Sequence, residues 1–578
     1  MTARRATLIV ILLLGAMGVA SFLAALRLRS PGGATGSASV LVLDMPYTLE
    51  ESEPPDRPLA LGPGRRGRLT LYTLVDAIGR AAADDRVGAL VLHIDDIGWG
   101  WAKLAEVRDA LAGFAAGGKP IYASLSGGGE AEYLLASAAG VVTMPPTAKL
   151  QLDGLSASVL FLRGTLDKVG VSPNFVHVGR FKSAVEGYTR TGMSAPAREA
   201  LEALLDDHYR LLVDSLAAAR GRSRAFIRRQ LDEGPFEARE ALARGLIDTL
   251  IYRPDLDSLA TRQGGQRLAT LPFRRYLSRL RRASRHGTRV ALITASGTIA
   301  PGRSRVGVDG EWILGAETLI ESLHEARERR SIRAVVLRID SPGGDAGASD
   351  EIWSEVSRCR AKKPVIASLS DYAASGGYYI AMGADSIVSG PATLTGSIGI
   401  YGGKMNVLGL LEKLGVHVET VSRGAHAEML SPFRDFSAEE KRRFELHLEE
   451  FYRGFVARVA DNRRMSPERV DSVAQGRVWT GLAARERGLV DALGGLETAL
   501  AMLRAKSGLS SDEALDVERL PRARVSLFQS IVDGLFSEDE GEAAERAGLS
   551  GALRTLAAAA RFPAGTALAH LPFTITIR

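Results

Sequence analysis

The chain has 578 residues, of which 46% are hydrophobic, 24% charged and 6% aromatic, and at roughly 100–200 residues per domain this length predicts two or more domains. The ordinary charged fraction excludes wholesale disorder and a multi-span membrane protein. The single cysteine, Cys359, excludes an intrachain disulfide framework and a cysteine-based structural zinc site. The net charge of +6 comes from scattered Lys and Arg residues, so no nucleic-acid partner is expected.

Residues 6–26 form an uncharged, apolar stretch, ATLIVILLLGAMGVASFLAAL. About 20 apolar residues are enough for a helix to cross a bilayer, so residues 1–30 are predicted to contain one transmembrane anchor and the start of a tether. The alternative is a cleaved secretory signal that ends near Gly18 and Ala20. The apolar run continues past Ala20, which favours the uncleaved anchor.

The rest of the chain contains two copies of one unit. Each of three segments in the first half has a partner about 240–245 positions later, in the same order. The pairs are VGALVLHIDD with IRAVVLRID, KPIYASLS with KPVIASLS, and GPFEAREALARGLID with GRVWTGLAARERGLVD. A tandem duplication follows, with one repeat at 38–262 and the other at 288–507.

Within each repeat, short β-branched runs such as AVVLRID alternate with helical stretches such as TLIESLHEARERR. This alternation predicts parallel strands covered by helices, an α/β architecture. Residues 263–287 are rich in arginine and are expected to form a basic linker, for which contact with anionic lipid headgroups is an alternative role. Residues 508–578 form a C-terminal extension in which no chemistry is predicted.

Two motifs in the second repeat are candidates for chemistry. SPGGD (341–345) follows a strand, and its paired glycines allow bare backbone N–H groups to approach a ligand. DYAASGGYYI (371–380) runs from a strand into a helix that is predicted to begin near Ser375. Ser375 is either an ordinary helix N-cap or a nucleophile whose oxyanion would meet backbone N–H groups. Comparison of the repeats favours the nucleophile, because the first repeat has Glu130 opposite Ser375 and lacks the paired glycines.

A serine hydroxyl needs a base at neutral pH. None of the nine histidines lies in a motif near Ser375, and His426, the best of them, has an ordinary loop context. Only eleven of the 73 basic residues are lysines, and one of them, Lys182 in GRFKSAVE, has no lysine counterpart in the second repeat. Lysine can act as a neutral amine when burial or a nearby cation, such as Arg180, lowers its pKa. Taken alone, Lys182 would be interpreted as an ordinary surface lysine, but the two repeats together would supply a Ser–Lys pair.

These motifs, together with TLTGSIGI and the N-terminal apolar stretch, resemble the signal peptide peptidase A family in its long, duplicated, membrane-anchored bacterial form. The resemblance implies a Clp-protease/crotonase-like fold, used twice behind one transmembrane helix, and a homotetramer. It implies that Ser375 is the nucleophile, Lys182 the general base and Ser397 the serine that orients the lysine. It further implies that the backbone N–H groups of Gly344 and Gly376 form the oxyanion hole.

The resemblance also implies the biological role. The chain would be a serine protease that degrades cleaved signal peptides and other hydrophobic peptides, anchored in the inner (cytoplasmic) membrane with its catalytic domains on the periplasmic side. No metal or organic cofactor is expected. Two alternatives remain, an inactive peptide-binding scaffold and a crotonase-type acyl-CoA enzyme. The sequence permits a dyad within one chain or between neighbouring chains.

Overall fold

The computed structural model describes residues 38–52, 69–263, 266–282, 287–307, 311–521 and 566–570. The apolar stretch 6–26 lies outside these ranges, so the membrane anchor remains a prediction from the sequence. Within the described ranges, no helix is both long enough and apolar enough to cross a bilayer.

The first repeat is built on a six-stranded sheet in which all neighbouring strands are parallel. Its strand order is β11 (Ala269–Pro272), β1 (Ser39–Asp44), β2 (Val87–Ile94), β3 (Ile121–Leu125), β4 (Val141–Met144) and β8 (Thr249–Leu250). Strand β2 reads VGALVLHI and is buried along nearly its whole length, as expected for a strand covered on both faces.

The helices of this repeat are α2 (Leu71–Ala83), α3 (Trp101–Ala116), α4 (Glu130–Ala136), α5 (Arg163–Val169), α6 (Glu186–Thr189), α7 (Ala195–Arg220), α8 (Arg224–Glu233), α9 (Ala238–Ala243), α10 (Arg253–Ala260) and α11 (Phe273–Arg282). Two short strand pairs complete it: β5 (Lys149–Leu150) with β7 (Phe236–Glu237), and β9 (Arg262–Gln263) with β10 (Gln266–Arg267).

The second repeat is built on an eight-stranded sheet that is parallel except for its β20–β22 pair. Its main order is β22 (Val478–Thr480), β20 (Leu394–Gly396), β18 (Val365–Ala374), β16 (Val335–Ser341), β12 (Thr288–Ser296) and β24 (Leu515–Leu520), and β19 (Ser386–Ser389) with β23 (Ala492–Leu493) joins it beside β18. Its helices are α12 (Ala316–Glu328), α13 (Ala346–Arg360), α14 (Gly376–Ala381), α15 (Leu408–Lys413), α16 (Ala438–Arg463), α17 (Pro467–Val473), α18 (Gly481–Glu486) and α19 (Leu496–Lys506).

The two repeats share local contacts as well as sequence. The hydroxyl of Tyr133 in α4 donates to the carbonyl of Leu246 at 2.6 Å, and the hydroxyl of Tyr378 in α14 donates to the carbonyl of Leu489 at 2.9 Å. The long helices α7 and α16 both have 26 residues. Each repeat also has its own large apolar core. The α/β architecture and the duplication are therefore both present in the structure.

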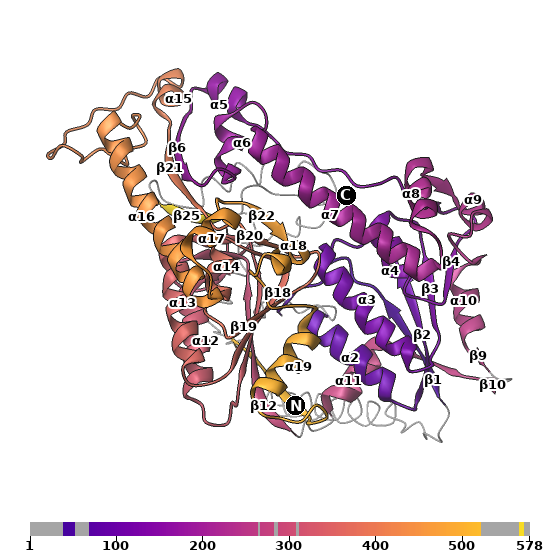
Figure 1. Ribbon diagram of the computed structural model, residues 1–578. Helices are drawn as coiled ribbons and strands as arrows, with labels where there is room; N and C mark the ends of the chain where they lie inside the picture. Colours follow the sequence, from indigo (N-terminus) through magenta and orange to yellow (C-terminus); the bar gives the residue numbers. More distant parts are fainter. Residues whose placement is uncertain are drawn as a thin grey trace, which may run out of the picture.

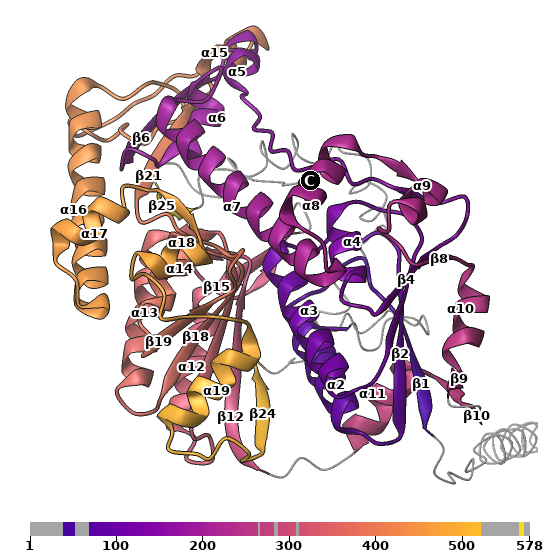
Figure 2. The same cartoon turned by 45° about the vertical axis from the view of Figure 1, so that its right-hand side comes forward.

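A third, seven-stranded sheet joins the two repeats. Its order is β14 (Arg305–Val306), β15 (Trp312–Gly315), β13 (Thr298–Ala300), β17 (Gly343–Asp345), β25 (Ala567–His570), β21 (Ile400–Asn406) and β6 (Ser172–Val178). Strand β6 comes from the first repeat, yet it pairs antiparallel with β21 of the second along its full length. In Figures 1 and 2, β6, α5 and α6 lie beside β21 and α15, and α7 runs from there back to the first sheet.

The segments outside the two predicted repeats also contribute to the sheets. Within 263–287, the expected basic linker, β11 pairs with β1 and the helix α11 buries Phe273 and Tyr276 in the first core. Within 508–578, β24 adds an edge strand to the second sheet and β25 lies inside the third. The described parts of both segments are thus structural elements rather than connectors.

Candidate active site

Ser375 lies at the junction between β18 and α14. It is fully buried, and its φ of 55° is in the left-handed region that a non-glycine residue rarely adopts. Its backbone N–H donates to the carbonyl of Gly396 at 2.8 Å. Its side chain makes no capping hydrogen bond to α14. The N-cap interpretation of this serine is therefore wrong, and its hydroxyl is left available for another partner.

That partner is Lys182, which follows β6 and precedes the 3₁₀ turn Ser183–Val185. The Lys182 Nζ lies 2.7 Å from the Ser375 Oγ, although 193 positions separate the two residues in the chain. Lys182 is fully buried. Burial lowers the pKa of its amine well below the ordinary lysine value. Arg180 does not contribute, because its exposed guanidinium pairs with Glu199 at 3.1 Å.

Ser397 completes a three-residue cluster around the amine. Its Oγ and its carbonyl oxygen accept from the Lys182 Nζ at 3.0 and 3.1 Å. Ser397 is also fully buried and has a φ of 51°. Ser375 and Lys182, indicated by the comparison of the repeats, and Ser397, implied by the family resemblance, therefore meet at one point. Two of the three have a strained backbone, which is typical of functional sites.

The segment 475–477 connects the lysine loop to the Ser397 loop, a role that was not predicted. The carbonyl of Gln475 accepts from Phe181 N, and the carbonyl of Arg477 accepts from Ser397 N. Between them, Gly476 donates its N–H to the carbonyl of Ile398 at 2.7 Å. The motif GRVWTGLAARERGLVD indicates the duplication and the family resemblance, but not this contact. The signal that could have identified this role is a glycine at the start of the motif, since glycine permits a close approach of backbone segments.

The glycine loop packs directly against the start of α14. The Ser341 Oγ donates to the carbonyl of Gly297 at 2.6 Å and accepts from Gly343 N. A Cβ at Gly377 would lie 2.6 Å from the carbonyl oxygen of Ser341, so the loop and the helix touch where only glycine fits. Gly344 lies in β17 of this loop and Gly376 is the first residue of α14.

The first repeat uses the corresponding position for structure. Glu130 is the first residue of α4, three positions before Tyr133, just as Ser375 stands three positions before Tyr378. The Glu130 carboxylate accepts from the backbone N–H groups of Asp153 and Gly154 at 2.8 and 2.7 Å. At this position the first repeat therefore has Glu130, which holds the loop at 153–154. The second repeat has Ser375, which contacts Lys182.

The histidine alternative finds no support in the geometry. His426 is half-buried and lies 3.5 Å from Glu439, on a different part of the second repeat. Within the described ranges, the recorded partners of the Ser375 hydroxyl are Lys182 and, at 3.4 Å, the carbonyl of Gly399.

Comparison with known proteins shows the family to which the chain belongs. Residues 114–264 and 357–510 match the family model described as Peptidase family S49. The chain belongs to this peptidase family. One matched segment lies mostly in each repeat, so the S49 unit is present twice, and membership makes the chain a serine protease.

Three relatives in this family cover most of the chain. "Serine protease SPPA, chloroplastic" of Arabidopsis thaliana is 36% identical, over 81% of this chain and 70% of that protein. "Protease 4" of Salmonella typhi is 34% identical over 75% of this chain and 71% of that protein, and "Protease 4" of Haemophilus influenzae is 30% identical over 80% and 78%. The solved ClpP1 of Listeria monocytogenes aligns with 35% of this chain and 89% of its own at 16% identity and a TM-score of 0.21, which is too low to carry an argument.

Proposed function

We propose that this S49 protease is a membrane-anchored endopeptidase with a Ser–Lys dyad that degrades cleaved signal peptides and other hydrophobic peptides. Ser375 is the nucleophile and Lys182 the general base. The observation that carries the proposal is the 2.7 Å contact between the Lys182 Nζ and the Ser375 Oγ in a fully buried site. A buried amine with a lowered pKa is one of the few bases able to activate a serine at neutral pH.

The three contacts of the amine are compatible with its neutral form. A neutral amine has two N–H groups and one lone pair. In the reactive arrangement, the N–H groups donate to the Oγ and the carbonyl oxygen of Ser397, and the lone pair accepts from the Ser375 hydroxyl. Ser397 thereby orients the lone pair of Lys182 towards the nucleophile, which is its proposed role.

The reaction then proceeds in two steps. Lys182 takes the hydroxyl proton of Ser375 as the Oγ attacks a peptide carbonyl, and the protonated amine returns that proton to the leaving amine. The backbone N–H groups of Gly344 and Gly376 are proposed to hold the oxyanion, each worth about 3–4 kcal/mol by analogy with other hydrolases. Lys182 then takes a proton from a water molecule whose oxygen attacks the acyl carbonyl, and it passes that proton to the Ser375 Oγ as the ester bond breaks.

We further propose that the substrate binds as an extended strand between β17 and β21. Extended peptides commonly bind by adding a strand to a sheet, because the backbone hydrogen bonds need no particular sequence. Support comes from β25, a segment far along the chain that occupies this position and pairs antiparallel with both strands. On one side this strand position is next to β17, which contains Gly344. On the other side it is next to β21, which begins shortly after Ser397.

The remaining assignments follow from the sequence. We propose a single N-terminal transmembrane helix in the inner membrane, catalytic domains on the periplasmic side, two Clp-protease/crotonase-like units and a homotetramer. We also propose that the dyad forms within one chain, which the intrachain contact of Lys182 with Ser375 supports.

The test uses the purified full-length protein in detergent, a chromogenic apolar peptide and a fluorophosphonate label located by mass spectrometry. Ser375→Ala and Lys182→Ala are each expected to lower kcat at least about a thousandfold, and the label is expected on Ser375. Lys119→Ala is the control, because the contacts described for the Lys119 Nζ, to the carbonyls of Ala81 and Asp84 and to the Phe114 ring, all lie in the first repeat and away from Ser375. An inactive scaffold would hydrolyse nothing, and a crotonase-type enzyme would consume an acyl-CoA instead. A label on another serine would contradict the proposal.

A further inference from the structure

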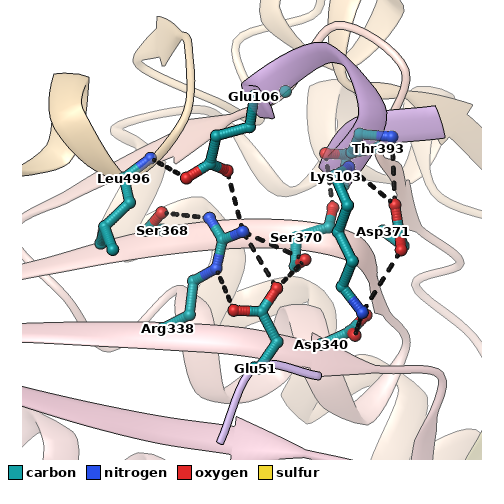
Figure 3. A network of polar contacts seen from close by, with 12 residues as sticks. Glu51, Lys103, Glu106, Arg338, Asp340, Ser368, Ser370, Asp371, Thr393 and Leu496 are labelled. Carbon is teal, nitrogen blue, oxygen red and sulfur yellow. Dashed lines mark hydrogen bonds and ion pairs between the residues drawn. The ribbon is translucent and has the colours of Figure 1, made fainter. Parts of the chain in front are cut away.

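A buried group of charges joins the two repeats next to the strand that leads to Ser375. Lys103 in α3 of the first repeat reaches two aspartates of the second, Asp340 in β16 and Asp371 in β18 (Figure 3). Its Nζ lies 2.7 Å from the Asp340 Oδ2 and 3.5 Å from the Asp371 Oδ2. We call these three residues the inter-repeat cluster. None of them belongs to the proposed dyad.

Asp371 also caps helix α3 from the opposite repeat. Its Oδ1 accepts from the backbone N–H groups of Ala102 and Lys103, both at 3.0 Å. The helix has no capping side chain of its own, because its N-cap is Gly100. A Cβ at residue 100 would lie 2.2 Å from the Asp371 carboxyl carbon. The N-terminus of α3, where a negative charge is favourable, is therefore docked on Asp371.

The cluster fills an irregularity in the second sheet. Ile339 pairs with Leu369, but two residues later Ser341 pairs with Ala373, so a single residue of β16, Asp340, faces residues 370–372 of β18. Such bulges interrupt the ladder of backbone hydrogen bonds and redirect the strand. The Asp340 Oδ1 accepts from Tyr372 N at 3.1 Å, so a side-chain hydrogen bond links the two strands within the bulge. The bulge thus depends on the side chain of Asp340.

Two of the segments that form the proposed active site, the glycine loop and the segment with Ser375, begin at this bulge. The glycine loop follows directly after Asp340, and Ser375 follows four residues after Asp371. We propose that Lys103 is a positioning residue for catalysis, which holds Asp340 and Asp371 together and so sets the distance between the glycine loop and Ser375. The first repeat would then contribute two residues to the reaction, Lys182 as the base and Lys103 as a positioning residue. The inference rests on the proposed function.

The negative charges of Asp340 and Asp371 explain why a cation is needed between them. Burial raises the pKa of Asp340; the ammonium of Lys103 opposes that rise, and the charges of Asp371 and Glu51 add to it. Without Lys103, two carboxylates would face each other in a buried site with no cation between them. Removing one partner of a buried ion pair leaves an uncompensated charge, which is strongly unfavourable. Either the two aspartates would move apart and open the bulge, or one of their carboxylates would take up a proton.

Helix α3 has a second attachment that keeps it docked when Lys103 is removed. Glu106 accepts from the Arg338 guanidinium at 2.9 Å and from Leu496 N at 2.9 Å, and Arg338 also pairs with Glu51 (Figure 3). Arg338 is almost completely buried. A variant at residue 103 is therefore expected to fold with the repeats in contact and to change only the bulge.

The experiment compares Lys103→Met with Lys119→Met in the full-length protein. Peptide hydrolysis gives kcat and KM, and the rate of fluorophosphonate labelling reports how well Ser375 is positioned. Lys103→Met is expected to lower both kcat and the labelling rate about 10- to 100-fold, with KM and the pH midpoint unchanged because Lys182 remains the base. Lys119→Met removes a half-buried lysine of the same repeat and is expected to keep the parent kcat.

A second pair of variants guards against misfolding. Asp371→Asn is nearly isosteric and keeps an oxygen for the N-terminus of α3, so it is expected to fold and to lower the labelling rate by itself. In the double variant Lys103→Met/Asp371→Asn the repulsion between the carboxylates is gone. It is expected to recover at least part of the labelling rate lost in Lys103→Met, whereas two unrelated losses of stability would add.

The outcomes separate this inference from the proposed function. If the parent protein is not labelled at Ser375, the proposed function fails. If the parent is labelled there and Lys103→Met and Asp371→Asn are labelled at the parent rate, only the role of Lys103 is refuted. The inference is also refuted if the two lysine variants lose activity equally, in proportion to their loss of thermal stability.

Discussion

Gly476 lies so close to Lys182 that a Cβ on the glycine would be 2.6 Å from the Cβ of the lysine. The same residue has a φ of 76° and donates to the carbonyl of Ile398, next to Ser397. Gly476 is therefore a spacer between the proposed base and the loop that orients it. Any side chain at this position must displace either Lys182 or the Ser397 loop.

Gly476→Ala is accordingly expected to lower kcat about 10- to 100-fold, because displacing a catalytic group by about 1 Å has effects of this size. Gly118→Ala is the matched control. Gly118 has a φ of 77°, so it imposes the same backbone strain, but nothing lies within 4 Å of its Cβ position. Equal losses of kcat in the two variants would show that strain alone accounts for the effect.

Lys182→Met is expected to abolish hydrolysis and, at neutral pH, to stabilise the protein by about 1 kcal/mol or more. Burial lowers the folded-state pKa of Lys182, so between that value and the ordinary lysine pKa the unfolded chain binds more protons. The parent protein should therefore gain stability as the pH rises through this window, and the variant should not. Urea unfolding at several pH values measures both effects. A less stable variant at every pH would contradict this assignment.

Deletion of residues 566–578 is expected to lower KM for peptides and leave kcat unchanged. The reason is that β25 occupies the strand position proposed for the substrate, between β17 and β21. Steady-state kinetics on the truncated and full-length proteins measure the change. Deletion of 571–578 alone keeps β25 and is the control. A truncated protein with unchanged KM would argue against substrate binding at this position.

Co-expression of Lys182→Ala with Ser375→Ala tests whether the dyad forms within one chain. Each variant lacks one member, and the contact in the structure joins residues of the same chain. Mixed oligomers, isolated through two different affinity tags, are therefore expected to stay inactive. Activity in the mixed oligomers would mean that Lys182 reaches Ser375 of a neighbouring subunit.

The residues proposed from the sequence lie together in the structure, whereas much of what surrounds them was not predicted. Ser375 and Lys182 could be identified because each has a feature that its counterpart in the other repeat lacks, and a duplication makes such differences visible. Glu130, the counterpart of Ser375 in the first repeat, has a structural role instead, because its carboxylate holds a loop.

Long-range pairing could not be predicted in this way. Nothing in the local pattern of 172–178 indicates that β6 pairs with a strand of the other repeat, because its partner β21 lies more than 200 positions away in the chain. Residues 263–287 are predicted to be a basic linker because arginines dominate their sequence, whereas only a few residues, such as Phe273 and Tyr276, fill the first core. The contact of Gly476 with Lys182 joins residues almost 300 positions apart and depends on backbone geometry alone.

The most direct test of the central claim is the rate of fluorophosphonate labelling of Ser375 as a function of pH, in the parent protein and in Lys182→Met. If Lys182 is the base, the parent rate rises with pH around a midpoint well below the ordinary lysine pKa of about 10.4, and the variant is labelled far more slowly at every pH. A variant that is labelled at the parent rate with the same pH dependence would contradict the assignment of Lys182 as the base.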